Sequence, residues 1–406
     1  MTTGVAMEEH CEAYFVWKRA GIKAAWCYHV DAHLDVGTDG LDDTTLARLA
    51  ACQSLDEARD QGLTGNAYLP WGGLHCGNYL YPAIREGIVN RLTWVIPPSL
   101  VEGSLLTWAR AHLNGWFDLE LAEYHHLKLV DGRVEGTVMG IPFELGTFEN
   151  LPRPDQPVLF DLDIDYFLTP TGELWQEAEQ FARECRLEAL MTTVAYSVLG
   201  GYTPTEYRRL AQPFVEGSVA GYEAGPIDQA AALVRFQRYD QALPILESLG
   251  QDYPVESAYL SGTCRHYLGQ PEKALEGWLE LFERPGLPPD GKLYLGGLCA
   301  EVAARLERPQ QALDVARQAQ AETQPDYRLC WAAALALEQL GEPMKATRML
   351  RRGLSLAAPY LNSLAMRSVL ARLYKRQGKA GLAKLELQKL EAEDVTGHFR
   401  ALTLLR

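Results

Sequence analysis

Residues 24–35 have the sequence AAWCYHVDAHLD, in which an apolar run passes directly into alternating acidic and imidazole side chains. The apolar run at 24–30 predicts a buried β-strand. Because side chains alternate between the two faces of a strand, Asp31, His33 and Asp35 would share one face at its carboxyl end. Ligands of α/β domains bind at the carboxyl ends of strands, so this segment bears on both the fold class and the functional site.

A second segment, VLFDLDIDYF at residues 158–167, repeats this arrangement. Asp161, Asp163 and Asp165 would share one face where another apolar strand ends. Burying even one bare carboxylate is costly, so five at two strand ends require compensation. Carboxylate and imidazole ligands without thiolates suit Mn²⁺, with Fe, Co or Zn as substitutes. The sequence therefore predicts a pair of divalent cations, and a set of hydrogen-bonded carboxylates at a loop-rich sheet edge is the alternative.

The chain around these segments alternates between strand-like and helix-like stretches up to about residue 200. Buried strands are predicted at 24–30, 92–96, 157–160 and 189–194, and helices at 41–58, 78–87, 104–114 and 173–187. This alternation is typical of a doubly wound α/β domain with a mostly parallel sheet.

The second half of the chain contains a helical repeat instead, from about residue 226 to 394. An alanine follows each predicted turn by five residues, at Ala242, Ala274, Ala312, Ala346 and Ala383. A period near 34 residues, with a small residue where two helices cross, resembles the tetratricopeptide repeat. We therefore expect an α/β domain at 1–215 and a helical repeat domain at 216–406. Such repeats bind peptides or proteins, and a purely structural or dimerising array is the alternative.

Charge divides along the same line. The 406 residues carry a formal net charge of −15, and residues 1–215 hold 30 acidic against 15 basic side chains, whereas the remainder holds 23 of each. An acidic domain repels nucleic acid and anionic lipid and suits metal ions or a cationic substrate. An ordinary acidic surface is the simpler explanation of the charge alone.

The composition also predicts a cytoplasmic protein. No run approaches the roughly 20 apolar residues of a membrane helix, and the first residues lack the features of a secretory signal. The eight cysteines include no Cys-x-x-Cys pair, so we expect reduced, buried thiols and neither disulfides nor a zinc ribbon.

The motifs at 31–35 and 163–165 resemble the metal-binding motifs of the arginase (ureohydrolase) superfamily. This resemblance implies an arginase-like fold with a dinuclear manganese cluster at the edge of a parallel sheet. It assigns His10 as an upstream ligand and His75, in a glycine-rich turn, as the catalytic proton donor. One cation would be held by His10, Asp31, Asp35 and Asp163, and the other by Asp31, His33, Asp163 and Asp165.

Three further side chains near these motifs receive supporting roles. Asp161 is expected to lie behind the ligands, since three successive carboxylates on one face rarely all reach one cluster. His29 is assigned to the opposite face of its strand and to a structural role. His10 is placed on a helix at 6–20, where a buried structural histidine is the alternative. His125–His126 is interpreted as a surface pair.

Two departures distinguish the chain from arginases that act on free arginine. The strand-end glutamate that meets the guanidinium is not evident, because TVAYS at 193–197 occupies that region. Residues that would grip the carboxylate of a free amino acid cannot be placed. The chain is more similar to the divergent arginase-like family that includes the peptide arginases, through HVDAHLD at 29–35, WVIP at 94–97 and DLDIDYF at 161–167. This resemblance covers about 1–210.

The resemblance implies a hydrolase of guanidino groups that converts peptidyl-arginine to peptidyl-ornithine and urea, with two Mn²⁺ as cofactors. Asp35 would hold the attacking water, and His75 would protonate the leaving amine. The expected partners are an arginine-containing precursor peptide and, through the repeats, another protein. Two alternatives stay open. One is another amidohydrolase or deacetylase of the same fold, and the other is a repeat scaffold whose N-terminal domain is inactive.

Overall fold

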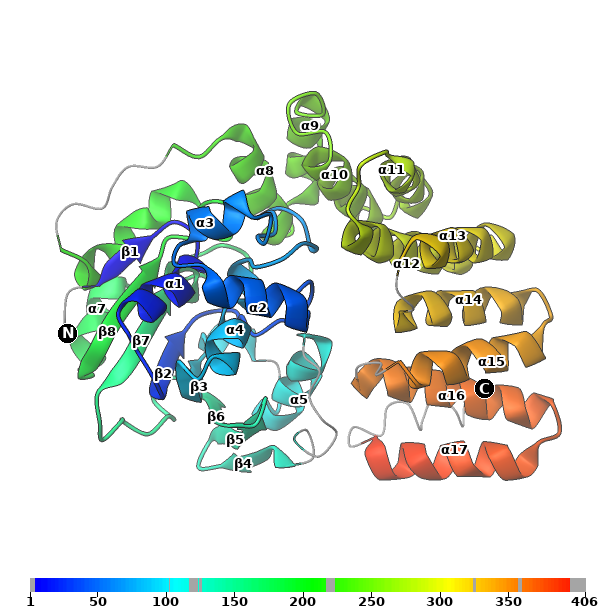
Figure 1. Ribbon diagram of the computed structural model, residues 1–406, viewed down its shortest axis with the longest axis horizontal. Coiled ribbons are helices and arrows are strands. Elements are labelled where there is room, and N and C mark those ends of the chain that lie inside the picture. The colour runs from blue at the N-terminus through cyan, green and yellow to red at the C-terminus, as the bar shows by residue number, and fades with distance from the viewer. Residues whose placement is uncertain are drawn as a thin grey trace. The chain divides into compact units, whose positions relative to one another are not determined.

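The computed structural model describes residues 4–101, 103–116, 123, 126–216, 223–323, 326–356 and 360–394. The chain forms two compact units, Met1–Cys264 and Arg265–Arg406. The first contains an eight-stranded sheet with helices, and the second is helical throughout its described residues (Figure 1). The secondary structure changes near residue 215, but the compact units divide inside helix α10 (Glu256–Tyr267), because the first helices of the repeat pack with the sheet domain.

The sheet has the strand order β1-β8-β7-β2-β3-β6-β5-β4. Its strands are β1 (Val5–Met7), β2 (Ala25–Val30), β3 (Val89–Val95), β4 (Lys128–Val130), β5 (Arg133–Val138), β6 (Ile141–Gly146), β7 (Val158–Asp163) and β8 (Ala189–Ala195). All neighbours from β1 to β6 in this order are parallel, and β5 and β4 add an antiparallel edge. The predicted mixed α/β domain with a mostly parallel sheet is confirmed.

The chain reverses direction across the sheet between β2 and β7. From β2 it proceeds to β3 and β6 on one side, and it then returns to β7 and β8 on the other side of β2. Such a reversal leaves the carboxyl ends of the two strands uncovered by their own connections, which makes this the place where α/β domains bind ligands.

Two apolar layers cover the sheet. Helices α1 (Glu12–Arg19), α2 (Asp43–Ala51), α3 (Leu55–Asp60), α4 (Leu80–Arg85) and α5 (Leu105–Trp116) supply one core, and α7 (Ala178–Glu184) with the 3₁₀ segment η4 (Thr205–Phe214) supplies the other. The alternation of side chains along β2 shows the division, because Cys27 belongs to the first core and Trp26 and Tyr28 to the second.

Several predicted boundaries were wrong. The helix predicted at 6–20 begins only at Glu12, because residues 5–7 form a strand that pairs with β8. The helix predicted at 41–58 is two helices, and the Ser54 hydroxyl caps the second of them by accepting a hydrogen bond from the Glu57 amide. The strands β5 and β6 were missed. His126 is exposed, whereas His125 lies outside the described residues.

The predicted helical repeat is confirmed. Its helices are α8 (Pro226–Arg235), α9 (Tyr239–Ser248), α10, α11 (Pro271–Glu283), α12 (Pro289–Arg305), α13 (Pro309–Glu322), α14 (Tyr327–Gln339), α15 (Pro343–Leu354), α16 (Tyr360–Arg376) and α17 (Ala380–Glu393). The five repeat alanines are buried and lie on every second helix. The residue five positions earlier is left-handed each time, at Gln237, Gly269, Glu307, Gly341 and Gly378. Every helix in the described part of the chain is too short or too polar to span a lipid bilayer.

Candidate metal centre

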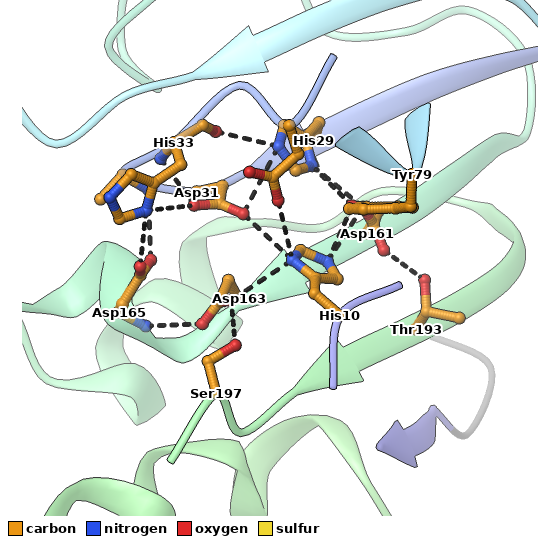
Figure 2. Close-up of polar contacts among 12 residues, drawn as sticks. His10, His29, Asp31, His33, Tyr79, Asp161, Asp163, Asp165, Thr193 and Ser197 are labelled. Atoms are coloured by element: carbon orange, nitrogen blue, oxygen red, sulfur yellow. Dashed lines mark hydrogen bonds and ion pairs between the residues drawn. The ribbon is translucent and has the colours of Figure 1, made fainter. Parts of the chain in front are cut away.

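Acidic and imidazole side chains converge where β1, β8, β7 and β2 end, at the reversal of the sheet (Figure 2). His10 follows β1, three side chains follow β2, and the others come from the end of β7 and the turn after it. The structure brings together all six predicted ligands, which are His10, Asp31, His33, Asp35, Asp163 and Asp165. The clustering is a product of long-range strand pairing, since His10 reaches it only because β1 lies beside β8.

The first group surrounds Nδ1 of His10. This atom lies 3.2 Å from Oδ2 of Asp31, 3.3 Å from Oδ2 of Asp35 and 3.3 Å from Oδ2 of Asp163. All four side chains are buried. They are the same four residues that the resemblance assigns to one cation.

Tyr79 orients the ring of His10. The Tyr79 hydroxyl lies 2.5 Å from Oδ2 of Asp161 and 2.9 Å from Nε2 of His10. The carboxylate of Asp161 can only accept, so the hydroxyl donates its hydrogen there and its oxygen accepts from Nε2–H of His10. Nδ1 of His10 therefore faces the three carboxylates. Burial opposes a second proton on the ring, but Asp161 and the facing carboxylates raise the pKa of His10 well above its usual value, so the metal-free ring also holds a proton on Nδ1, which a cation would displace.

This arrangement fits a divalent cation. Among the described residues, Nδ1 of His10 and Oδ2 of Asp31 are buried and form no hydrogen bond, although buried polar atoms are almost always paired. In the metal-free protein a proton on Nδ1 offsets the charge of the carboxylates, and a divalent cation would supply more positive charge in the same place. Hydrogen bonds satisfy Asp161, and Nδ1 of His10 and Oδ2 of Asp31 face each other at 3.2 Å, so the metal centre and the hydrogen-bonded alternative both stay predictions.

The second group is centred on His33. Nδ1 of His33 lies 2.9 Å from Oδ2 of Asp165 and 3.6 Å from Oδ1 of Asp31, so Asp31 belongs to both groups. The side chain of His33 is 47% exposed, in contrast to the other ligands. Asp163 was also predicted to bridge. Its Oδ2 faces His10 and accepts a hydrogen bond from Ser197, and its Oδ1 accepts from the Asp165 amide at 3.1 Å.

A polar layer lies beneath the ligands. Asp161 accepts hydrogen bonds from Tyr79, from Thr193 at 2.5 Å and from Nδ1 of His29 at 2.9 Å. It therefore holds His10 and His29 in place, in agreement with its predicted position behind the ligands.

The assignment of His29 to the opposite strand face was wrong. Residues 29 and 31 have the same parity, and His29 pairs in register with Asp161 of β7. Its Nδ1 faces that carboxylate, and its Nε2 lies 3.0 Å from the carbonyl oxygen of His33. Both partners only accept, so both ring nitrogens carry protons. Burial opposes this charge, but Asp31 and Asp161 raise the pKa of His29 above its usual value.

The metal-free cluster holds protons that cations would displace. Burial and the neighbouring Asp31 raise the pKa of Asp35 to about 6. Burial and Asp163 raise the pKa of Asp165 as well. Asp31 behaves oppositely, because the neighbouring imidazoles overcome its burial and lower its pKa. Carboxylates and imidazoles that share protons in this way release them when they bind a metal ion.

Two residues of the cluster have an unusual backbone. Asp35 has a φ of 56° and Ser197 a φ of 49°, in the left-handed region that residues with side chains seldom adopt. The carbonyl of Asp35 accepts a hydrogen bond from the Leu80 amide at 3.1 Å, which helps to hold it there. Strain of this kind persists where the surroundings impose it, and it concentrates at functional sites.

His75 lies in a neighbouring loop. Its ring caps the 3₁₀ turn η1 (Cys76–Asn78), where Nδ1 accepts a hydrogen bond from the Gly77 amide at 3.0 Å. Burial and the charge of Arg235 lower the pKa of His75 to about 4. In the free protein the ring is therefore neutral with its proton on Nε2. Among the described residues no hydrogen bond joins this ring to the carboxylates, so its role as proton donor stays a prediction.

Sequence reasoning missed several residues of the site. No role was assigned to Tyr79, Thr193 or Ser197, although they lie in segments noted for the resemblance, and only their places next to a turn and at the end of a strand could have indicated one. Tyr202 was also missed. Its ring is nearly perpendicular to the His33 ring at 5.4 Å between centroids, and the guanidinium of Arg235 from α8 lies over it, with Cζ 3.4 Å from the ring centre.

Comparisons with known proteins concern the helical region. No family model and no curated protein matches the chain. The helical region is similar to MamA residues 41 to the end from Desulfovibrio magneticus RS-1, at 16% identity over 42% of this chain and 93% of that chain, with a TM-score of 0.37. It is also similar to TTC0263, a thermophilic TPR protein in Thermus thermophilus, at 25% identity over 45% of this chain and 98% of that chain, with a TM-score of 0.34.

Proposed function

We propose that the N-terminal unit is an arginase-like, dinuclear-metal hydrolase of guanidino groups that converts peptidyl-arginine to peptidyl-ornithine and urea. The observation that carries this proposal is that Nδ1 of His10 lies within 3.3 Å of three buried carboxylates, which include the shared Asp31. Oxygen and imidazole donors without a thiolate favour Mn²⁺, with other divalent cations as substitutes. The helical region would bind the peptide or a partner protein.

The proposed ligand sets keep the assignment made from the resemblance. His10, Asp31, Asp35 and Asp163 would hold one cation, and Asp31, His33 and Asp165 would hold the other together with Asp163. Bound cations would supply the nucleophile, because a water between two divalent ions has a pKa close to neutrality.

The protein's own groups would do the rest. Asp35 would accept a hydrogen bond from the attacking water and orient it toward the guanidinium carbon. The excess of carboxylates would attract the cationic side chain. His75 would deliver the proton on Nε2 to the leaving nitrogen as the C–N bond breaks and would regain one that the attacking water releases, so that the amine leaves protonated; Nδ1 is occupied by the Gly77 amide.

A peptide substrate is favoured because no described residue is identified that would bind the α-carboxylate or α-amino group of free arginine. Near the end of β8, Glu8 accepts hydrogen bonds from the amides of Val198 and Leu199 at 3.1 Å and pairs with Arg208. Because its carboxylate already binds these groups of the protein, Glu8 does not serve as the glutamate that meets the guanidinium of a substrate. The exposed side of His33 leaves the mouth of the site open toward solvent, where the backbone of a peptide could lie.

The test begins with metal content. After reconstitution with Mn²⁺, elemental analysis should find two metal ions per chain, and the protein should then release urea from an arginine-containing peptide and leave ornithine, detected by mass spectrometry. The same peptide with lysine in place of arginine is the matched substrate control, and Asp31→Asn is the control variant. Turnover of free arginine or agmatine alone would exclude the peptide substrate. One metal ion per chain with turnover of acylated lysine would identify a deacetylase, and no bound metal would overturn the proposal.

A further inference from the structure

We propose that Arg235, stacked on Tyr202 at the exposed edge of the metal centre, is a subsite for a carboxylate of the substrate. The protein would then prefer arginine peptides that carry an acidic side chain or a free C-terminal carboxylate next to the target arginine. This inference rests on the proposed function and names the substrate class more narrowly.

The guanidinium of Arg235 is held in a defined position. Its Nε donates to the Gly200 carbonyl at 2.8 Å, its Nη2 donates to the Ala67 carbonyl at 3.3 Å, and Cζ lies 3.4 Å from the centre of the Tyr202 ring. The two carbonyls belong to different loops. A guanidinium that is already oriented loses little freedom when it binds a planar anion, and its Nη1 has no hydrogen-bond partner among the described residues.

The helix that carries Arg235 is packed tightly against the loop that carries Tyr202. Gly201 has a φ of 77°, and a Cβ there would lie 2.2 Å from the Ala232 amide nitrogen of α8. Asp228 of the same helix accepts a hydrogen bond from the Gly200 amide at 3.2 Å. The position of Arg235 beside the site is therefore set by packing and does not depend on the side chain alone.

The charge of Arg235 is not neutralised by a carboxylate. Among the described residues no acidic side chain forms an ion pair with it, although acidic side chains outnumber basic ones two to one in residues 1–215. Its nearest acidic candidate on α8, Asp228, bonds the Gly200 amide and the Tyr68 hydroxyl instead. Together with burial, the charge of Arg235 lowers the pKa of His75, so this charge acts on the loop that carries His75.

The guanidinium of Arg235 lies where the backbone of a bound peptide would lie. His33 is the exposed residue among the proposed ligands, and its ring and the guanidinium of Arg235 both contact the ring of Tyr202. A substrate arginine has to extend its long side chain past this rim to reach the buried carboxylates, so its backbone and neighbouring residues remain at the rim. An adjacent carboxylate would meet Arg235 there, whereas an adjacent lysine would be repelled.

The test compares peptides that differ only beside the arginine. Three amidated peptides carry Glu, Gln or Lys before the arginine. A further pair of peptides ends in arginine, one as the free acid and the other as the amide. With the Mn²⁺-loaded full chain, kcat/KM should fall about fivefold from Glu to Gln and again from Gln to Lys. A free-acid preference without a Glu preference would assign the subsite to the C-terminal carboxylate.

Variants of Arg235 decide whether this residue is responsible. Arg235→Gln should remove the preference, Arg235→Glu should reverse it, and Arg235→Lys should retain it, while Arg238→Gln, at an exposed arginine bonded to Gln241, should change nothing. A purely structural Arg235 would lower kcat/KM for all peptides by one factor and leave their ratios intact, which would overturn the inference.

Failure of the inference and failure of the proposed function give different results. If wild type turns over no peptide, calorimetric binding of the same peptides is compared instead. A Glu preference in binding that Arg235→Gln abolishes would support the subsite and reject the reaction. Absence of any such preference would reject the subsite.

Discussion

His10 is oriented by Tyr79, to which the sequence analysis assigned no role. The buried hydroxyl of Tyr79 joins Nε2 of His10 to Asp161, and this connection directs Nδ1 at the carboxylates. Groups that orient a metal-binding histidine through its second nitrogen commonly affect metal affinity nearly as much as a ligand does.

Replacing Tyr79 with phenylalanine should therefore weaken metal binding without removing a ligand. We expect the affinity for Mn²⁺ to fall about 10- to 100-fold, because the His10 ring loses the acceptor that orients it. Isothermal titration calorimetry with Mn²⁺ measures the effect. Tyr81→Phe is the matched control, since the Tyr81 hydroxyl bonds Arg85 near the surface. Equal affinities for Tyr79→Phe and wild type would show that the hydroxyl does not hold the ligand.

Asp35 should destabilise the metal-free protein at neutral pH. Because its pKa in the folded state is raised to about 6, folding favours the protonated form, and stability is lost as pH rises from the unfolded pKa through 6. Asp35→Asn mimics the protonated form. It should raise the free energy of unfolding at pH 7–8 by about 1–3 kcal/mol, with a difference that fades toward pH 4, while abolishing stabilisation by Mn²⁺.

Asp31→Asn should change the free energy of unfolding in the opposite direction to Asp35→Asn. The pKa of Asp31 is lowered, so its charge stabilises the fold at neutral pH and its loss should lower the unfolding free energy of the metal-free protein. Urea unfolding in the presence of a chelator, at several pH values, measures both variants. A loss of stability in Asp35→Asn at pH 7–8 would contradict the raised pKa of Asp35.

At the scale of elements, the repeat depends on a left-handed residue at the end of each first helix. Gly341 occupies this position in one repeat, where the next amide returns to the Leu337 carbonyl at 2.8 Å. Glu307 occupies the equivalent position in the preceding repeat with a φ of 57°, and the next amide returns to the Ala303 carbonyl at 2.9 Å. A glycine adopts this backbone without the steric cost that a Cβ adds.

Glu307→Gly should therefore stabilise the helical unit. We expect a gain of about 0.5–1 kcal/mol, because relief of the left-handed strain exceeds the extra entropy that glycine loses on folding. The exposed side chain of Glu307 forms no hydrogen bond or ion pair with another described residue. Gly341→Ala is the reciprocal variant and should cost about 1 kcal/mol. Thermal unfolding followed by circular dichroism measures both, and a destabilised Glu307→Gly would reject this explanation of the turn.

At the scale of the whole molecule, the compact unit that carries the candidate metal centre includes the first helices of the repeat. Asn66 donates to Glu256 of α10 at 2.8 Å, and the ring of Trp71 meets the ring of Tyr259 at 5.2 Å. These contacts lie on the loop that leads to His75. The compact unit consequently extends to Cys264, well past the change in secondary structure near 215.

A fragment of residues 1–264 should fold and bind Mn²⁺ like the full chain, whereas a fragment of 1–215 should not. The shorter fragment exposes Trp71 and the close-packed surface of Gly201, and it loses an apolar cluster that includes Ile227, Ala231 and Leu246. Circular dichroism and Mn²⁺ titration compare the two fragments. Normal Mn²⁺ binding by the 1–215 fragment would show that the first unit folds without helices α8 to α10, and it would support a domain boundary near residue 215.

Sequence patterns predicted the parts of this molecule that depend on neighbouring residues. The apolar runs of β2, β3, β7 and β8 and the alanines of the repeat were found because burial imposes local periodicity. The same periodicity places His29 on the face of Asp31, so its misassignment was an error of parity. Strand β1 was missed because three residues carry too little pattern to distinguish a strand from the start of a helix.

The sequence by itself determined that carboxylates and histidines crowd the ends of two buried strands and that a helical repeat follows, because composition and spacing are local properties. Only the tertiary structure decided that His10 faces those carboxylates through Nδ1, that Tyr79 orients it and that Arg235 of the repeat stands at the rim. These placements arise from strand order and helix packing between residues far apart in the chain, and no local pattern encodes which distant segments will pack together.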